Sequence, residues 1–339
     1  MLEIIKTECK KIVDEIGFSS FKDKKVLITG ASGIVGVYLI SCLKEIKEKN
    51  NIKIFCWVNS KIEDSFIDLY EGCTVIRGDI TNESMFNSLS EGEKFDLIVH
   101  SAGYAQPNKF LEDKIKTIQL NTYSTIKLFE LLHKDGSFVF MSTSELYSGL
   151  NFENIKENEI GNSSPGHPRA CYIEGKRCGE SICNAYIEKG YNVKIIRLSL
   201  AYGPGTKKND QRVLNSLFQK AFENQEIKLL DSGSSVRTYG YITDVIEMIW
   251  HISMSGKHNV YNVAGNSVTT IKELAYKIGN MTGCKVIVPD NDNSALAGNP
   301  LLVNISLERY ISEFNKKHFV SLDEGLRKTF LWQKALYGK

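Results

Sequence analysis

Residues 25–36 read Lys25-Val-Leu-Ile-Thr-Gly30-Ala-Ser-Gly33-Ile-Val-Gly36. An apolar run typical of a β-strand leads into three glycines spaced three residues apart, and the apolar residues 37–43 then continue as a helix would. Glycines at such a turn let backbone amides and a helix N-terminus approach a pyrophosphate. The first gap is one residue longer than in G-x-G-x-x-G, so an ordinary strand-to-helix turn stays open on this motif alone.

Short β-type runs alternate with helical patterns along the chain. Continuous apolar strands that alternate with helices are typical of a parallel sheet covered on both faces, so the sequence predicts an α/β, Rossmann-type doubly wound fold. The expected strands are Val26–Thr29, Ile52–Val58, Thr74–Arg77, Leu97–Ser101, Ser137–Ser142 and Val193–Leu198, and the expected helices include Ile115–His133 and Cys171–Glu188.

Four groups of candidate residues follow the ends of these strands. The glycine turn follows the first strand, Asp79 the third, Ala102-Gly103 the fourth and Thr143 to Glu145 the fifth. Ligands of parallel sheets bind beyond the carboxyl ends of the strands. The four groups are therefore expected at one edge of the sheet, around one ligand.

A tyrosine and a lysine four residues apart, Tyr172 and Lys176, share one face of the second expected helix. An ammonium beside a phenol favours the phenolate and lowers its pKa, which makes tyrosine a usable base near neutral pH. Tyr123 and Lys127 have the same spacing, but they lie mid-helix before the fifth strand, where packing is the favoured interpretation. The sequence thus favours Tyr172 as the base.

Composition narrows the class of protein. The 339 residues carry a formal charge of +2 without a long basic run, which predicts neither a nucleic-acid nor a membrane partner. No apolar run approaches a membrane span or a signal peptide. The eight cysteines contain no C-x-x-C pair and are expected to be reduced thiols of a cytoplasmic protein, and the six histidines lack ligand spacing, so no metal site is expected. Leu2, Ile5, Cys9, Ile12 and Ile16 recur at helical spacing and predict an amphipathic N-terminal helix within residues 1–24, docked on the sheet or on a partner subunit.

From about Lys25 to Leu331 the chain resembles the extended short-chain dehydrogenases/reductases that modify nucleotide sugars. Ser142-Thr-Ser-Glu-Leu-Tyr147 and Pro168-Arg-Ala-Cys-Tyr-Ile-Glu-Gly-Lys-Arg177 are most similar to the UDP-glucuronate decarboxylases of that family. The other matching motifs are the glycine turn, Gly78-Asp79-Ile80, Ile98–Gly103, Asn121-Thr122, Arg197 with Tyr202-Gly-Pro204, and Arg237 with Tyr241–Asp244. The resemblance implies an NAD-binding domain of residues 25–200 and 239–262, and a nucleotide-sugar-binding lobe of residues 201–238 and 263–339.

The resemblance also implies roles. Tyr172 would take the proton of the sugar 4-hydroxyl while C4 gives a hydride to NAD, Lys176 would hold the phenolate and the nicotinamide ribose, and Thr143 would hydrogen-bond the same sugar oxygen. Glu145 would protonate C5. The implied cofactor contacts are Gly30, Ser32, Gly33, Ile34, Val35, Gly36, Asn59, Lys61, Asp79, Ile80, Ala102, Gly103, Asn121, Tyr172 and Lys176, and the implied substrate contacts are Tyr104, Ser144, Arg212 and Arg237.

The exact reaction stays open at this point. Related 4,6-dehydratases carry an acid where Ser144 stands, so dehydration is disfavoured. Once C4 is a ketone, a 5-carboxylate is a β-keto acid that loses CO2 with little further help, which favours decarboxylation. The alternatives are a nucleotide-sugar 4-epimerase or 4-dehydrogenase, a 4-ketosugar reductase acting on a heptose or deoxysugar, and a catalytically silent NAD-binding regulator. The resemblance further implies a cytoplasmic enzyme of surface-polysaccharide biosynthesis that forms a homodimer through a four-helix bundle.

Three positions depart from the family pattern. Leu200 replaces a substrate-contacting asparagine, and a late arginine is replaced near Leu301. The second strand ends in Asn59-Ser60-Lys61 without the carboxylate that selects NAD, and Lys61 is suited to a 2′-phosphate, so NADP stays open beside NAD.

Overall fold

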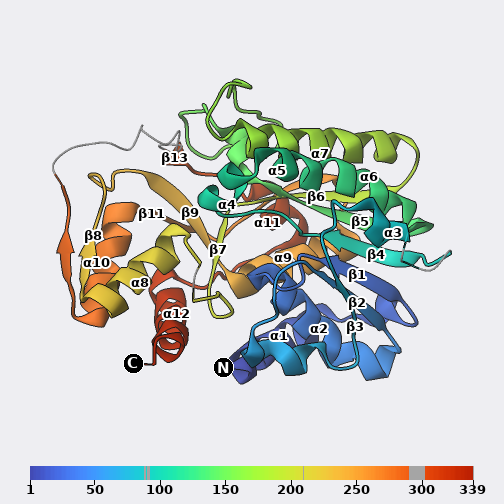
Figure 1. The fold of residues 1–339 in the computed structure, drawn as a ribbon, viewed down its shortest axis with the longest axis horizontal. Helices are drawn as coiled ribbons and strands as arrows, with labels where there is room; N and C mark the ends of the chain where they lie inside the picture. The colour runs from blue at the N-terminus through green and yellow to red at the C-terminus, as the bar shows by residue number, and fades with distance from the viewer. Residues whose placement is uncertain (88, 90–91, 209, 290–301, 339) are drawn as a thin grey trace.

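The computed structural model describes residues 1–87, 89, 92–208, 210–289 and 302–338 (Figure 1). Within these residues seven parallel strands form one sheet in the order β10-β6-β5-β4-β1-β2-β3. The strands are β1 (Lys25–Thr29), β2 (Lys53–Val58), β3 (Thr74–Arg77), β4 (Phe95–His100), β5 (Leu132–Thr143), β6 (Asn192–Leu198) and β10 (Val260–Val263). The predicted Rossmann-type fold and its six strands are confirmed, and β10 adds an edge strand.

Helices cover both faces of this sheet (Figure 1). One layer holds α5, α6 and α7, and the opposite layer holds α1, α2 and α9, which pack against one another. The order of strands reverses between β1 and β4, the position at which doubly wound sheets bind their ligands. The bounds are α1 (Leu2–Ile16), α2 (Ile34–Asn50), α3 (Glu83–Asn87), α4 (Pro107–Glu112), α5 (Lys114–Asn121), α6 (Tyr123–Glu130), α7 (Ala170–Glu188) and α9 (Ile242–Ser255), with 3-10 helices η1 (Ser19–Phe21), η2 (Asp64–Tyr70) and η3 (Ser144–Tyr147).

The single helix expected over Ile115–His133 is wrong. The chain breaks at Thr122, whose hydroxyl donates to the Ile118 carbonyl at 2.9 Å, a local bond that competes with regular helix. The second helix, α6, ends at Glu130, because Leu132 already pairs with Phe95 of β4 and is buried in the sheet. His133 therefore belongs to β5.

A smaller lobe stands beside the carboxyl edge of the large sheet (Figure 1). Its sheets join β7 (Leu200–Tyr202), β9 (Val236–Tyr241), β11 (Ser267–Thr270) and β13 (Leu302–Val303), and separately β8 (Glu226–Lys228) and β12 (Lys285–Ile287). A capping box between Thr270 and Glu273 begins α10. The remaining helices are α8 (Val213–Asn224), α10 (Ile271–Thr282), α11 (Glu308–Phe314) and α12 (Leu322–Leu336). Helix α11 packs on β10 of the large sheet. The expected assignment of residues 263–339 to the lobe therefore stays a prediction.

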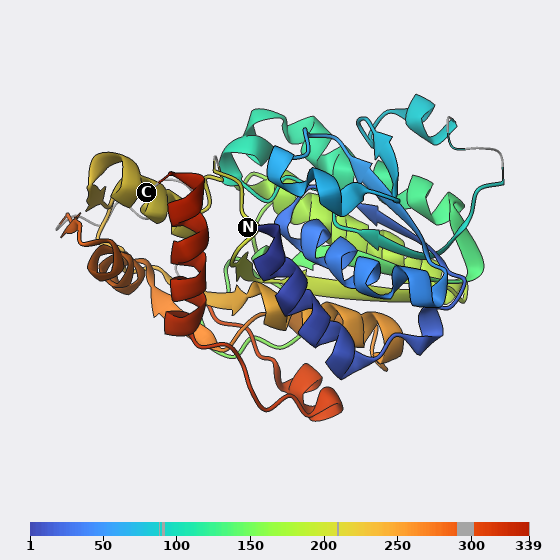
Figure 2. The same cartoon turned by 90° about the horizontal axis from the view of Figure 1, so that it is seen from below.

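The predicted N-terminal helix is confirmed as α1. Ile5 and Cys9 are fully buried against α2 and α9, so the apolar face is covered within this chain. Beside this face Glu8 accepts hydrogen bonds from Tyr38 (2.9 Å) and Tyr241 (2.8 Å) and pairs with Lys328 of α12 at 3.3 Å. Figure 2 shows α1 and α12 together on the underside of the molecule.

All eight cysteines are free thiols, and five of them are buried. No helix among the described residues has the length and apolar character needed to cross a membrane.

Candidate active site

The glycine turn brings β1 close to β4. Gly30 has φ +64°, and a Cβ there would lie 2.6 Å from the Ser101 carbonyl, so only glycine fits. Gly33 begins α2 without any side-chain cap, and a Cβ on Gly33 would meet only the Gly30 carbonyl within 4 Å. The first amides of α2 are therefore accessible from the adjoining cavity, the arrangement that receives a pyrophosphate.

A cavity of about 580 Å³ opens at this edge between the large sheet and the lobe. It has the size of a site for a dinucleotide or similar ligand. Most of the predicted site residues line it: Gly30, Ser32, Gly33, Ile34, Val35, Gly36, Asn59, Asp79, Ile80, Ala102, Gly103, Tyr104, Thr143, Ser144, Glu145, Tyr172, Lys176 and Arg212.

Three predicted contacts do not line this cavity. Lys61 is exposed and pairs with Asp64 at 3.1 Å. Asn121 is buried and donates to the Thr117 carbonyl, and its own Oδ1 has no protein partner. Arg237 is half-buried and donates to the Val236 carbonyl at 2.8 Å. The departure at Leu301, and residues 290–301 around it, lie outside the described residues.

Tyr172 and Thr143 are brought together at the floor of the cavity. Tyr172 lies in the first turn of α7, and Thr143 is the last residue of β5. Burial, followed by the charge of Glu145, raises the pKa of Tyr172 to about 12, and a hydrogen bond with Thr143 lowers it in part. In the protein alone the balance therefore runs opposite to the expected lowering. The phenol is therefore protonated, with the Thr143 hydroxyl as a hydrogen-bonding neighbour.

Lys176 lies one turn further along α7. Its ammonium donates to the Met141 carbonyl at 2.5 Å and lies 4.9 Å from the centre of the Phe140 ring. Burial lowers the pKa of Lys176 to about 7. A Cβ on Gly103 would approach Nζ to 3.7 Å, so the ammonium faces the strand-end glycine across the cavity. It is thus placed to bind a hydroxyl or an anionic group of a ligand.

Glu145 is held by an arginine that the sequence analysis assigned no role. Arg169 Nε donates to Glu145 Oε2 at 2.9 Å, and its second nitrogen donates to Oε1. Both residues are largely buried, and the guanidinium also lies over the Phe110 ring at 4.9 Å. A carboxylate held on both oxygens accepts hydrogen bonds and does not donate a proton in this arrangement. The expected role of Glu145 as an acid stays a prediction.

The other end of the cavity holds hydroxyls and a lysine. Ser32 and Ser60 hydroxyls lie 2.8 Å apart, and Lys207 of the lobe donates to Ser60 at 3.3 Å. Asn59 also lines this end, as does Glu63, whose Oε1 lies 3.9 Å from Lys207 Nζ. Burial lowers the pKa of Lys207 by disfavouring its charged form, and an anionic ligand beside the ammonium would oppose this effect.

Asp79 stands near this end and is paired. Burial raises the pKa of Asp79, but hydrogen bonds from Lys116 and Thr81 outweigh burial and hold that pKa below its usual value. The carboxylate is therefore ionised and ordered at a position where the resemblance implied a cofactor contact.

Arg212 reaches the cavity in a fixed orientation. Its Nε donates to both oxygens of Asp210 at 3.0 Å, and the backbone amide of Arg212 also donates to that carboxylate. The sequence analysis missed Asp210, although its position two residues before Arg212 was a usable signal. Gln106, Lys109 and Lys207 also line the cavity and were missed, because they come from the start of the short helix α4 and from a loop, neither of which has a recognisable period.

The chain matches the model of the NAD dependent epimerase/dehydratase family over residues 26–264 and belongs to that family. It is 28% identical to UDP-glucuronic acid decarboxylase 1 of Xenopus tropicalis over 272 residues, which are 79% of this chain and 63% of that protein. It is 25% identical to UDP-glucuronic acid decarboxylase 3 of Arabidopsis thaliana over 306 residues, which are 89% of this chain and 86% of the relative. The matches thus span 63% and 64% of the lengths of the Xenopus tropicalis and Danio rerio relatives.

Solved structures agree with the fold. UDP-glucose 4-epimerase of Thermotoga maritima, solved with UDP-glucose, superposes with a TM-score of 0.76 at 20% identity, covering 92% of this chain and 99% of that one. MoeE5 in complex with UDP-glucuronic acid and NAD superposes with a TM-score of 0.73 at 18% identity, again covering 92% and 99%. The chain therefore has the fold of the extended short-chain dehydrogenases/reductases, and the family to which it belongs is one of NAD-dependent enzymes.

Proposed function

We propose that this protein oxidises C4 of a nucleotide-diphosphate sugar and releases CO2 from a 5-carboxylate, as a UDP-glucuronate decarboxylase does. The observation that carries the proposal is the contact of Tyr172 with Thr143, beside Lys176, in a cavity that also contains the glycine turn. The decarboxylase names of the relatives support the substrate class.

The cavity fits NAD on its own features. The uncapped start of α2, the open space over Gly33, and the cationic groups Lys176 and Lys207 at the two ends suit a dinucleotide with an anionic pyrophosphate. Lys61, the candidate for a 2′-phosphate, instead pairs with Asp64 and does not line the cavity, which favours NAD over NADP. Bound NAD supplies the hydride acceptor, and the donor when the hydride returns to C4.

The protein's own residues would move the protons. Tyr172 is the base for the 4-hydroxyl, and Thr143 orients the phenol by hydrogen bonding. In its charged form Lys176 favours the phenolate over the phenol. The C4 ketone accepts the electron pair of the C5–carboxylate bond as CO2 leaves, and C5 then takes up a proton. Glu145 would supply that proton only after its ion pair with Arg169 has broken.

A 4-epimerase or 4-dehydrogenase is the second candidate. It is favoured by Leu200, which lines the cavity where the family usually has an asparagine, and by the pairing of Glu145 with Arg169. Such reactions need Tyr172, Thr143 and Lys176 but no further acid.

The experiment is incubation of the NAD-loaded protein with UDP-glucuronate, followed by mass spectrometry of the sugar nucleotide. Loss of CO2 with wild type, and none with Tyr172→Phe at equal NAD occupancy, is the expected result. UDP-glucose in a parallel incubation tests the epimerase. Unchanged UDP-glucuronate with cofactor bound would reject the decarboxylase assignment.

The assembly and location belong to the same proposal. Ile115 (68%), Ile118 (39%) and Ile126 (41%) are exposed on α5 and α6, the layer expected to form a four-helix bundle with a second copy. A homodimer would cover these apolar side chains. The free cysteines suit the reducing cytoplasm, where precursors of surface polysaccharides are made.

A further inference from the structure

Arg197 of β6 forms a buried ion pair that does not line the active-site cavity. Its Nε donates to Glu180 Oε1 at 3.0 Å and its NH2 to Glu180 Oε2 at 2.8 Å, and the two side chains are 5% and 8% exposed. Burial lowers the pKa of Arg197, but the bonds with Glu180 outweigh it and raise that pKa. The guanidinium is therefore charged. Apolar residues of similar volume often stabilise a fold equally well, so stability alone does not account for this pair.

The pair holds the residue just before the proposed catalytic segment. Ser142 donates to Glu180 Oε1 at 2.5 Å. In the sheet Ser142 is the direct partner of Arg197, and Thr143 is the partner of Leu198. The end of β5 is thus tied to the ion pair through both its backbone and its side chain.

The same guanidinium holds Tyr147, which lies two residues after that segment. Arg197 NH1 donates to the Tyr147 hydroxyl at 3.0 Å and the guanidinium carbon lies 5.2 Å from the centre of the Tyr147 ring. Tyr147 in turn donates to Asn262 Oδ1 at 2.6 Å. Burial, against the effect of Arg197, raises the pKa of Tyr147 to about 12, so the hydroxyl keeps the proton that it donates.

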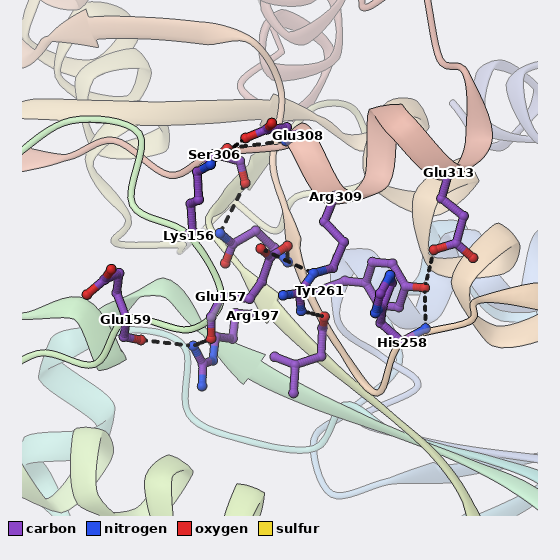
Figure 3. Close-up of polar contacts among 12 residues, drawn as sticks. Lys156, Glu157, Glu159, Arg197, His258, Tyr261, Ser306, Glu308, Arg309 and Glu313 are labelled. Atoms are coloured by element: carbon purple, nitrogen blue, oxygen red, sulfur yellow. Dashed lines mark hydrogen bonds and ion pairs between the residues drawn. The ribbon is translucent and has the colours of Figure 1, made fainter.

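The loop after η3 completes the arrangement. Arg197 NH1 also donates to the carbonyls of Glu157 (2.9 Å) and Glu159 (3.2 Å), and Glu157 accepts from the Asn262 amide at 3.0 Å. Figure 3 shows Arg197 directed at this loop, with Glu157 between it and Arg309. The Arg197–Glu180 pair is thus the common partner of β5, which it meets through Glu180, and of η3 and the loop, which it meets through the guanidinium.

We infer that Arg197 is a positioning residue for Thr143–Glu145, which it holds at both ends through Ser142 and Tyr147. The inference rests on the proposed function, in which Thr143 must stay in hydrogen-bonding range of the Tyr172 phenol. Loosening either end lets Thr143 move away. This movement lowers the rate of the proton transfer and removes the hydrogen bond that holds the pKa of Tyr172 down.

The test compares two buried tyrosine hydroxyls. Tyr147→Phe removes the hydroxyl that bonds to Arg197 and Asn262 and keeps the aromatic ring. Tyr261→Phe is the matched control, because that hydroxyl is buried and bonded to Glu313 at 2.6 Å and to the His258 amide at 2.9 Å, but does not touch the segment. With the active sugar nucleotide, Tyr147→Phe is expected to lower kcat about tenfold with KM changed less than about twofold, and the control to change neither.

A second measurement needs no substrate. The NAD-loaded protein is titrated by ultraviolet absorbance with and without the additional change Tyr172→Phe, and the difference reports the Tyr172 phenol alone. The pKa of Tyr172 should rise in Tyr147→Phe and in Ser142→Ala but not in Tyr261→Phe. An unchanged pKa of Tyr172 in both Tyr147→Phe and Ser142→Ala would overturn the inference. An equal rise of that pKa in Tyr261→Phe would overturn it as well. If Tyr172→Phe retained turnover, the proposed function would fail by itself. If Tyr172→Phe were inactive while Tyr147→Phe kept the activity of the wild-type protein, only the positioning role would be rejected.

Discussion

The rings of Phe110 and Tyr172 lie parallel, with centroids 4.8 Å apart and 7° between their planes. Phe110, in the short helix α4, is 1% exposed and covers one face of the proposed base. Burial is the first cause of the raised pKa of Tyr172, so the Phe110 ring controls how strongly that phenol holds its proton.

Phe110→Leu is therefore expected to lower the pKa of Tyr172, because water reaches the face of the phenol that the ring covers. The alkaline rise of kcat/KM should move to lower pH. A large-to-small change at a buried phenylalanine also costs up to about 3 kcal/mol of stability, to be measured by urea unfolding. Phe129→Leu, on another buried ring stack, is the control that should lose stability without moving the pH profile. An unmoved profile in Phe110→Leu would contradict the expectation.

Lys176 should make stability depend on pH. Its folded pKa of about 7 lies below the usual lysine value of about 10.4, so between these pH values the unfolded chain binds a proton that the folded protein lacks. The free energy of unfolding then rises with pH in this window, by at most about 1.4 kcal/mol per pH unit. Chemical unfolding of the cofactor-free protein at pH 7 and pH 9 should show this gain, and Lys176→Met should lack it. Equal gains in both proteins would show that Lys176 is solvated.

Lys207 should slow the release of NAD. It crosses from the lobe to Ser60 and to the Lys61 carbonyl at 3.4 Å, and its loop is held by Trp332, which donates to the Thr206 carbonyl at 2.9 Å. Lys207→Met is expected to raise the dissociation rate of NAD about tenfold. The rate is measured by displacing bound NAD in a stopped-flow instrument. Lys220→Met, also in the lobe, is the matched control, because the Lys220 ammonium donates to the Lys228 carbonyl at 2.9 Å and the residue does not line the cavity. Equal release rates in the two variants would rule out a specific role for Lys207.

The exposed isoleucines test the proposed dimer. Ile115→Glu together with Ile118→Glu places charge on the α5 face and should convert a dimer into a monomer, measured by light scattering at micromolar concentration. Leu230→Glu, at a position 86% exposed in the lobe, should leave the mass unchanged. A wild-type protein that is already monomeric would contradict the dimer.

Much of the site followed from two periodicities. The strand-end rule brought Gly33, Asp79 and Thr143 to one edge, and the helical spacing placed Tyr172 and Lys176 one turn apart. The contacts that decide protonation were not predictable in this way. Arg169 meets Glu145 and Phe110 meets Tyr172 across 24 and 62 residues of chain (169 − 145 and 172 − 110), through a loop and a short helix without sequence period. The pKa balance at Tyr172 depends on such burial, which spacing does not report.

The break at Thr122 was missed for a related reason. The apolar pattern of residues 115–133 continues through the break, whereas the competing hydroxyl bond to Ile118 is a local detail. The start of β5 at Leu132 depends on pairing with Phe95, which tertiary structure decides.

Glu8 has a consequence for how this chain is made. Its carboxylate is shared by Tyr38, Tyr241 and Lys328, so α1, which is synthesised before α12, obtains its last partner only after α12 has been made. Until then α1 carries a half-satisfied acid. Contacts between such distant parts of a sequence form slowly and late. During translation the Rossmann sheet therefore assembles beneath a helix whose docking is completed only after α12 has been made.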